Sequence, residues 1–478
     1  MPGVWVPSCP GGEYATVRIS KIILDDFKSV RHGEIVLNCG KQFVKAGTEP
    51  DILGLYGQNG SGKSTVIEAL SILQSLLSGD SVPDEYADCI AVDAEFAHMY
   101  FEFDFQYPDE RKLRVSYAAS ISKEPKPREN SRTVGEFSDP DFGYRIRVFD
   151  EMVKIEGLVD GEERQFRSCI DTLSSSAKPF GPASRHSDFY EVNTANKKAL
   201  STNLILAAER SKSFIFMDET MDIFYQEGKN ASQVFLVLAE LNLFAKRYFF
   251  VIDASFSASY SDDFYLPFFT RRGVIPFSLR ESLPVPLSFI PELEKALEST
   301  NGVLEELVPG LSIDKRQVGS VFTKDGHDAV SLDFISCRDG LEFPLRNESD
   351  GIRKLISVIN LFIAAFNEKS VTVAIDEFDA GIFEYLLGEM LQIFEDSGRG
   401  QFIFTSHNLR PLEVLSKKYI RFTTTNPDNR YYSMKGVATN NNLRDFYFRE
   451  IVMGEQDEEL YSSGKRFKLV SSLRRADF

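Results

Sequence analysis

Hydrophobic positions along the chain follow two different periods, and the changes between them predict the order of strands and helices. Alternating or continuously apolar runs with many β-branched residues are typical of strands, whereas apolar residues spaced three and four apart are typical of helices. Strands are predicted at 16–24, 34–37, 51–56, within 94–118, 144–166 and 318–343, and at 371–375 and 401–405. Helices are predicted at 64–77, 230–248, 291–307, 351–366 and 382–394.

The order of these elements indicates an α/β protein. After residue 351, short and continuously apolar strands alternate with helices, which is typical of a parallel sheet buried on both faces. The period-two alternation at 94–118 and 144–166 predicts an antiparallel section. From about residue 172, helices are separated by aromatic-rich segments, which we interpret as an inserted, mainly helical lobe.

These changes of pattern divide the chain into five parts. A tail rich in Pro and Gly is expected to be loose, because it offers no periodic apolar pattern. The parts are the tail at 1–15, the N-terminal lobe of a head at 16–171, the inserted lobe at 172–317, the C-terminal lobe of the head at 318–435 and a C-terminal segment at 436–478.

The composition is that of an ordinary globular protein with an acidic surface. Hydrophobic residues are 43% and charged residues 26% of the 478 residues, which excludes a disordered or collagen-like chain. The net charge of -17 repels a phosphate backbone, so nucleic-acid binding is not favoured and would need a local patch, such as the basic cluster in the C-terminal segment. The five cysteines are scattered, and no apolar run is long enough to span a membrane. We therefore predict a cytoplasmic protein without disulfides, zinc or membrane contact.

A glycine-rich motif directly follows the predicted strand at 51–56. It comprises Gly57, Gln58, Asn59, Gly60, Ser61, Gly62, Lys63, Ser64 and Thr65, of which the first eight fit GxxxxGK[ST]. In such a P-loop, backbone N–H groups at a helix N-terminus bind phosphates, the lysine neutralises their charge and the serine holds Mg²⁺. Because a strand precedes the motif and an amphipathic helix follows it, the sequence predicts binding of ATP and Mg²⁺.

A P-loop also requires a carboxylate at the end of a neighbouring strand to hold the magnesium ion. Three apolar runs end in an aspartate, at Asp218, Asp253 and Asp376. Asp253 has no following carboxylate to polarise water, and Asp218 lies in the inserted lobe without a polar element after a next strand. We therefore expect Asp376 to hold Mg²⁺, Glu377 to polarise the attacking water and His407, after the next strand, to contact the γ-phosphate.

Lys63 and Asp376 lie near opposite ends of the chain, so one nucleotide site would be assembled from both ends around a long insertion. This layout resembles ABC-type heads of the SMC and RecF kind. Ser349-Asp350-Gly351 stands where such heads carry a Ser-Gly signature that opens a helix, although taken alone it is an ordinary helix cap. The resemblance implies that Ser349 and Gly351 contact the γ-phosphate of ATP held by a second copy, and hence a homodimer or higher homo-oligomer.

Longer phrases carry a narrower resemblance. They are ILGLYGQNGSGK at 52–63, IDEFDAGIFEYLL at 375–387, TSHNLRPL at 405–412 and NNLRD at 441–445. Together they resemble the ATPases of bacterial abortive-infection and phage-defence operons, namely the AbiL-like group and the AriA subunit of PARIS systems, which are relatives of the OLD family. The resemblance implies a scaffold and sensor that holds a Toprim-type nuclease, supplied in trans, and releases or activates it on a phage-encoded trigger.

Two other functions remain open at this point. One is a DNA-repair ATPase of the RecF or SMC kind, which would show DNA-stimulated hydrolysis that depends steeply on salt. The other is a structural module that binds nucleotide but hydrolyses it negligibly. Its assembly would not respond to loss of the Glu377 carboxylate.

Overall fold

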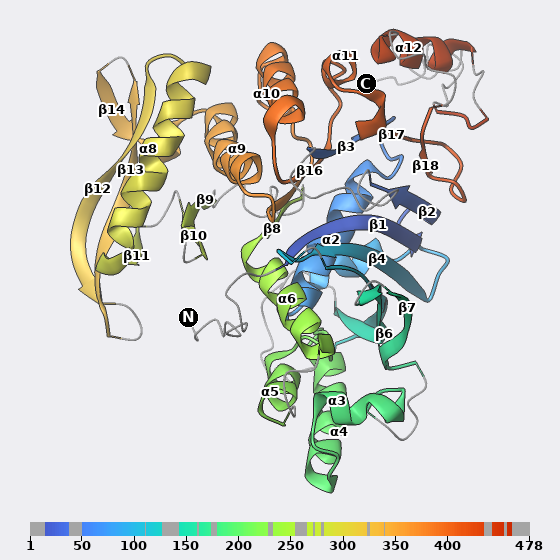
Figure 1. The fold of residues 1–478 in the computed structure, drawn as a ribbon. Coiled ribbons are helices and arrows are strands. Elements are labelled where there is room, and N and C mark those ends of the chain that lie inside the picture. Colours follow the sequence, from blue (N-terminus) through green and yellow to red (C-terminus); the bar gives the residue numbers. More distant parts are fainter. Residues whose placement is uncertain are drawn as a thin grey trace, which may run out of the picture.

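A computed structural model describes most of the chain and shows the arrangement in Figure 1. The described residues are 15–37, 50–109, 111–126, 143–159, 162–173, 179–227, 233–253, 265–270, 273–278, 282–322, 326–338, 340–434, 442–453 and 457–460. The loose tail predicted before residue 16 and the basic cluster predicted near the C-terminus lie outside these residues, apart from Ala15.

A mostly parallel sheet forms the centre of the molecule. Its strand order is β18-β17-β3-β16-β15-β8, with bounds β18 Tyr431–Tyr432, β17 Ile420–Thr423, β3 Asp51–Tyr56, β16 Gln401–Thr405, β15 Thr372–Ile375 and β8 Phe249–Ile252. The P-loop strand β3 pairs in parallel with β16 and β17, both from the C-terminal part of the chain. The predicted α/β head, assembled from both ends of the chain, is therefore confirmed.

The strands of this sheet are continuously apolar because both of their faces are covered. In β3, Leu53 and Leu55 face one hydrophobic core, whereas Ile52 and Tyr56 face the other. In β16, Ile403 belongs to the first core and its neighbours Phe402 and Phe404 to the second. Alternate side chains of a strand point to opposite faces, so each core takes every second residue.

The first core lies between the central sheet and an antiparallel sheet. That sheet has the order β2-β1-β4-β5-β6-β7, with bounds β2 Val30–Val36, β1 Thr16–Phe27, β4 Phe96–Gln106, β5 Lys112–Pro125, β6 Tyr144–Val159 and β7 Glu162–Asp171. Helix α2, Lys63–Ser78, contributes apolar residues to this core beside those of both sheets. It is buried on several faces because it is enclosed by two layers (Figure 1).

The second core lies on the other face of the central sheet. It is covered by α9, Asp350–Asn367, and α10, Glu384–Ser397, and continues to α8, Ile290–Leu307. A third sheet packs beside α8 and contains β11 Leu283–Pro286, β12 Leu311–Phe322, β13 Asp328–Arg338 and β14 Leu341–Pro344. The remaining elements are β9 Tyr265–Thr270, β10 Gly273–Ser278, α3 His186–Phe189, α4 Thr194–Glu209, α5 Asp218–Glu227, α6 Gln233–Arg247, α11 Pro411–Val414, α12 Leu443–Met453 and the 3₁₀ turns η1 Asp84–Cys89, η2 Ala183–Arg185, η3 Leu287–Phe289, η4 Leu345–Asn347 and η5 Lys417–Tyr419.

The prediction of one separate inserted lobe at 172–317 is wrong in its middle and at its end. Strand β8 is part of the central sheet, where it pairs in parallel with β15. Helix α6 packs against α2 and contributes to the first core, while α8 belongs to the second. Helices α3, α4 and α5 lie together at one end of the molecule (Figure 1), where Phe189, Leu200 and Phe224 still contribute to the first core. The head therefore includes residues that the composition assigned to the insertion.

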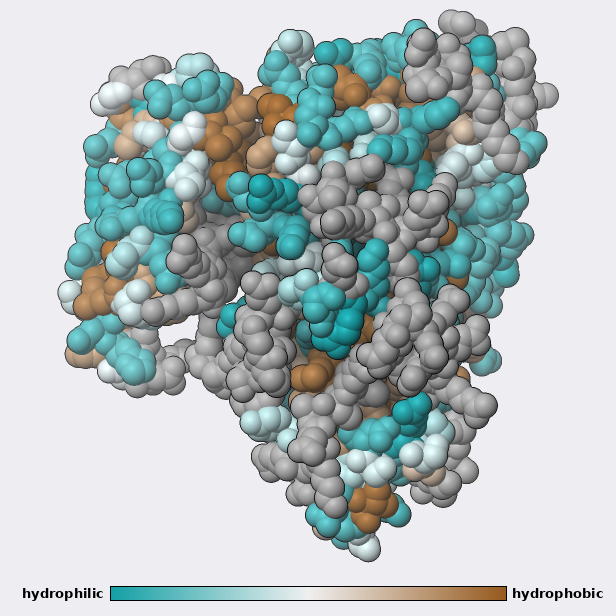
Figure 2. All heavy atoms as spheres, viewed as in Figure 1, coloured by the Kyte–Doolittle hydropathy of each residue, from teal (hydrophilic) through white to brown (hydrophobic). Residues whose placement is uncertain are grey.

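The outer surface is chiefly hydrophilic on the face shown in Figure 2, where hydrophobic residues gather in separate patches. Among the described helices, none combines the length and the apolar character that a membrane crossing requires.

Candidate nucleotide site

The P-loop is built where β3 ends and α2 begins. Gly57, Gly60 and Gly62 have φ values of 154°, 74° and 90°, in the region that glycine adopts without strain. A side chain at Gly57 would also collide with the hydroxyl oxygen of Thr423 on β17, 1.8 Å from the position of its Cβ. The loop therefore requires glycine for its turn and for the close approach of β17. All nine predicted residues from 57 to 65 lie in this loop and the first turn of α2.

Lys63 is folded back over the loop. Its Nζ donates hydrogen bonds to the carbonyl oxygens of Gly57, at 2.9 Å, and Gln58, at 3.0 Å, and the residue is only 5% exposed. Burial lowers the pKa of Lys63, while the charges of Asp376, Glu377 and Asp379 act in the opposite direction. The ammonium group is therefore held inside the loop, close to where a phosphate would enter.

Asp376 lies next to the P-loop. Its Oδ1 accepts a hydrogen bond of 3.2 Å from the Ser64 hydroxyl, and Thr405 on β16 donates to the same oxygen. The residue is 4% exposed, and its Oδ2 has no hydrogen-bond partner within the described residues. A buried carboxylate oxygen without a partner next to a serine hydroxyl is a donor set that fits Mg²⁺, which binds through one or two carboxylates, waters and phosphates.

Glu377 turns its side chain outward at the end of β15. Its φ of 48° is left-handed, its side chain is exposed, and its backbone N–H donates to the Thr405 hydroxyl at 2.8 Å. His407 lies at the end of the adjacent strand β16 and is also exposed. Its backbone N–H donates to the Asp379 carboxylate, as does that of Asn408 at 3.0 Å. Both predicted residues therefore lie on the same edge of the sheet as the P-loop.

Ser349 and Gly351 form the N-terminus of α9. The Ser349 hydroxyl accepts a bond from the backbone N–H of Ile352 at 3.4 Å, which is the ordinary role of a helix N-cap. Gly351 packs against Gly381, in the loop after β15, so closely that a Cβ on Gly351 would lie 2.8 Å from the Gly381 carbonyl oxygen. Contact of these residues with a nucleotide on a second copy stays a prediction.

The two aspartates that the sequence analysis did not assign to the magnesium site, Asp253 and Asp218, lie outside the contacts of Asp376 with the P-loop. Asp253 ends β8, beside β15, but its Oδ2 accepts hydrogen bonds from Ser71, at 2.8 Å, and from the hydroxyl of Tyr86. Asp218 opens α5 on the surface, and the preceding segment 214–217 is a turn rather than a strand.

Sequence reasoning missed several residues that hold the P-loop in place. The Tyr431 hydroxyl donates to the Gly62 carbonyl at 2.9 Å, and the Thr423 hydroxyl donates to the Tyr56 carbonyl at 3.2 Å. Ser29, in the turn between β1 and β2, donates to the Gly60 carbonyl at 3.5 Å. None of these belongs to a local motif, because each reaches the loop from a distant segment. Thr405, which contacts Asp376 and Glu377, could have been found from the sequence, because it is the last residue of the predicted strand that precedes His407.

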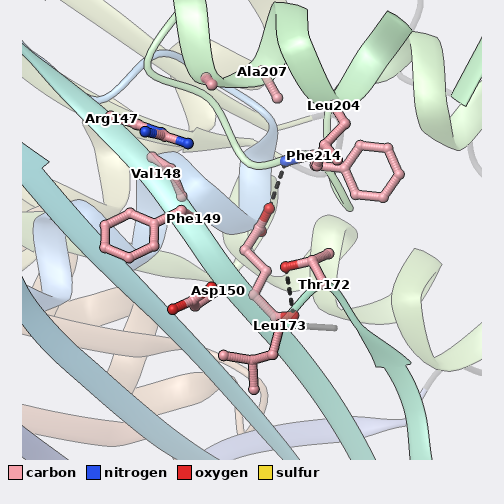
Figure 3. A pocket seen from close by; sticks show the side chains of 11 residues that line it. Arg147, Val148, Phe149, Asp150, Thr172, Leu173, Leu204, Ala207 and Phe214 are labelled. Atoms are coloured by element: carbon pink, nitrogen blue, oxygen red, sulfur yellow. Dashed lines mark hydrogen bonds between the residues drawn. The ribbon is translucent and has the colours of Figure 1, made fainter. Parts of the chain in front are cut away.

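A cavity of about 540 Å³ lies away from this site, between β6 and α4. Figure 3 shows the side chains of Arg147, Phe149 and Leu173 on one side of it and those of Leu204 and Phe214 on the other. Glu151 lies at its inner wall, where burial raises the pKa of the carboxyl group. The carboxyl group of Glu151 bonds β6 to the segment before α5, so we assign it a structural role.

Replacing Glu151 with alanine should lower the free energy of unfolding by about 3 kcal/mol, because three buried donors lose their acceptor. These are the hydroxyls of Tyr117, at 2.8 Å, and Ser213, and the backbone N–H of Phe214, at 2.7 Å. Urea unfolding followed by circular dichroism would measure the change. The control Glu191→Ala, at an exposed position, should change it by less than about 0.5 kcal/mol. Equal stability of the two variants would contradict the structural role.

Comparison with solved structures finds several that are similar to this chain at low identity. An SMC head domain with an extended coiled coil, bound to the C-terminal domain of ScpA and derived from Pyrococcus furiosus, is 11% identical, with 87% of this chain and 96% of that chain covered and a TM-score of 0.38. The SMC head domain from Thermotoga maritima is 13% identical, with 87% and 99% covered and a TM-score of 0.35. The recombination mediator protein RecF with ATP is 13% identical, with 83% and 93% covered and a TM-score of 0.33. A search of curated proteins found no match.

A protein-family model matches most of the chain. Its description is "AAA domain, putative AbiEii toxin, Type IV TA system", and it matches residues 52–413. The matched region begins in β3, contains the P-loop, Asp376, Glu377 and His407, and ends in α11. Because the match covers most of the sequence, the chain belongs to this AAA ATPase-domain family.

Proposed function

We propose that the chain is an ABC-type ATPase that binds ATP with Mg²⁺ and hydrolyses it to ADP and phosphate. The observation that carries the proposal is the meeting of Ser64 and Asp376, from opposite ends of the chain, at 3.2 Å. One oxygen of the Asp376 carboxylate has no partner within the described residues, in a position suited to a metal ion. The two residues are far apart in the sequence, so the fold brings them together.

The residues around this pair support a division of roles. Lys63 and the backbone N–H groups at the start of α2 neutralise and orient the phosphates, and Ser64 and Asp376 hold Mg²⁺, which supplies charge neutralisation of the γ-phosphate. Glu377 accepts the proton of the attacking water, since its carboxylate is exposed beside the site. His407 contacts the γ-phosphate from the end of β16.

We further propose that a second copy of the chain completes the site. The Glu377 carboxylate is exposed to solvent, although catalysis of phosphoryl transfer benefits from exclusion of bulk water. Ser349 is exposed at the N-terminus of α9, where backbone N–H groups favour a negative charge. A homodimer, or a higher homo-oligomer, would place Ser349 and Gly351 of one copy over the nucleotide of the other.

The biological role that fits this ATPase is that of a scaffold and sensor in bacterial anti-phage defence. The phrases at 52–63, 375–387 and 405–412 resemble the ATPases of abortive-infection operons, and the family description names an AbiEii toxin. In this role ATP binding sets an assembly that holds a Toprim-type nuclease encoded in trans. A phage-encoded trigger protein then releases or activates the nuclease.

The first test is the solution mass of the Glu377→Gln protein, purified together with the products of its neighbouring genes. With Mg-ATP we expect a dimer or larger ring that carries a second polypeptide, and without nucleotide a smaller species. Light scattering coupled to gel filtration measures the mass, and mass spectrometry identifies the bound polypeptide.

Other outcomes would point elsewhere. A bare monomer in both states would contradict the composite site. Hydrolysis stimulated by duplex DNA, with a steep salt dependence and no bound polypeptide, would favour a RecF-like or SMC-like repair ATPase instead.

A further inference from the structure

The backbone of Glu377 is held in an unusual conformation from both sides. Its φ of 48° lies in the left-handed region, which is costly for a residue with a Cβ and needs support from its surroundings. Its N–H donates to the Thr405 hydroxyl at 2.8 Å. Its carbonyl oxygen accepts from the backbone N–H of Ala380, at 2.9 Å, and from the ammonium group of Lys354, at 2.5 Å. The direction of the Glu377 side chain therefore depends on these contacts.

Among these partners, Lys354 joins the loop that carries Glu377 to a helix. It lies in α9, one turn after the Ser349 cap, and reaches across to the loop after β15. Burial lowers the pKa of Lys354, and the charges of Glu377, Asp379 and Asp376 offset this effect only in part. Its Nζ donates to the Glu377 carbonyl beside the carboxylates of the site.

A second contact joins the same two segments. The first turn of α9 lies against the loop after β15 at Gly351 and Gly381, where the close approach leaves no room for a side chain. Gly381 has a φ of 77°, so the loop also needs glycine for its own turn. The start of α9 and the loop that carries Glu377 are therefore held together at two points, at Glu377 and at Gly381.

We propose that Lys354 is a positioning residue, whose ammonium group fixes the Glu377 carbonyl and through it the direction of the Glu377 carboxylate. This inference rests on the proposed function, since it assumes that Glu377 activates water. It adds that α9 contacts and positions the loop that carries Glu377 in the same chain. This role is separate from any contact of the α9 N-terminus with a second copy. Displacement of α9 would then misplace Glu377 and slow hydrolysis.

The experiment compares Lys354→Met and Lys354→Arg in the full chain by steady-state ATP hydrolysis. Methionine keeps the length of the side chain but removes the donor, so kcat should fall by about 10- to 100-fold while KM changes by less than about threefold. Arginine keeps a charged donor and should recover most of kcat. Lys369→Met, just beyond the other end of α9, is the control and should leave both constants unchanged. If the methionine variant is insoluble, Lys354→Gln gives the same comparison.

The double variant of Lys354→Met with Glu377→Gln separates positioning from a general effect on structure. If Lys354 acts through Glu377, the double variant should turn over as slowly as Glu377→Gln alone, within about threefold. Multiplied losses, a raised KM at unchanged kcat, or normal kcat in Lys354→Met would each overturn the inference. Normal turnover in Glu377→Gln would instead overturn the proposed role of Glu377 in activating water, so the two failures are distinguishable.

Discussion

Replacing Glu377 with glutamine should lower kcat for ATP hydrolysis by roughly 10² to 10⁴ while ATP remains bound. Glutamine has the shape of glutamate but cannot accept the proton of the attacking water. The contacts that hold this position, from Thr405 and Lys354, are made to the main chain, so the substitution leaves them in place. Single-turnover release of phosphate measures the chemical step. Titration with a fluorescent ATP analogue measures nucleotide affinity, which should change by less than about threefold.

A matched control is Glu389→Gln, an exposed glutamate on α10, which should hydrolyse ATP at the normal rate. Normal turnover in Glu377→Gln would mean that another group activates the water. Asp253 would be a poor substitute, because it is buried and accepts hydrogen bonds from Ser71 and Tyr86. A loss of both turnover and ATP binding would instead assign Glu377 to nucleotide binding.

Three adjacent strands of the six-stranded central sheet, β3, β16 and β15, could be predicted because their physics is local. Strands buried on both faces must be apolar at every position, so β3, β15 and β16 stand out as short apolar runs. The P-loop is equally local, since the turn, the helix start and the lysine are consecutive in the sequence. The carboxylate pair at 376–377 was found because it ends one of those runs.

Strand β8 could not be assigned to the sheet in the same way. Its apolar run is as short as that of β15, but it follows α6 in a region dominated by helices and aromatic side chains. Its place is decided by parallel pairing with β15, more than a hundred residues later in the chain. Nothing in the pattern of a four-residue strand specifies such a distant partner, so composition alone placed it in an insertion.

The supporting contacts of the site escaped prediction for a related reason. Tyr431, Thr423 and Lys354 each donate a hydrogen bond to a main-chain carbonyl of the P-loop, the end of β3 or the catalytic loop. A main-chain acceptor leaves no trace in the sequence, because every residue has one. The sequence therefore identifies the residues that we propose to contact the nucleotide better than it identifies those that hold them in position.

Replacing Lys63 with alanine should abolish measurable ATP binding and, in the proposed role, protection against phage. The ammonium group is buried in the loop, where it donates to the carbonyls of Gly57 and Gln58. In the alanine variant no ammonium group would neutralise the partial negative charge of those carbonyl oxygens near the phosphates. An unneutralised triphosphate in a partly desolvated loop is costly, so affinity should fall by at least about 100-fold.

Equilibrium binding of a fluorescent ATP analogue tests the loss of affinity, and plaque counts on cells that carry the whole gene cluster test protection. Lys21→Ala is the control, because Lys21 forms an ion pair with Glu34 between β1 and β2 and makes no contact with the P-loop. Wild-type affinity in Lys63→Ala would contradict the nucleotide site itself. If Lys63→Ala loses ATP affinity but still protects cells fully, the proposed ATPase activity would stand. The proposed role in defence would be contradicted, because protection would then not require bound ATP.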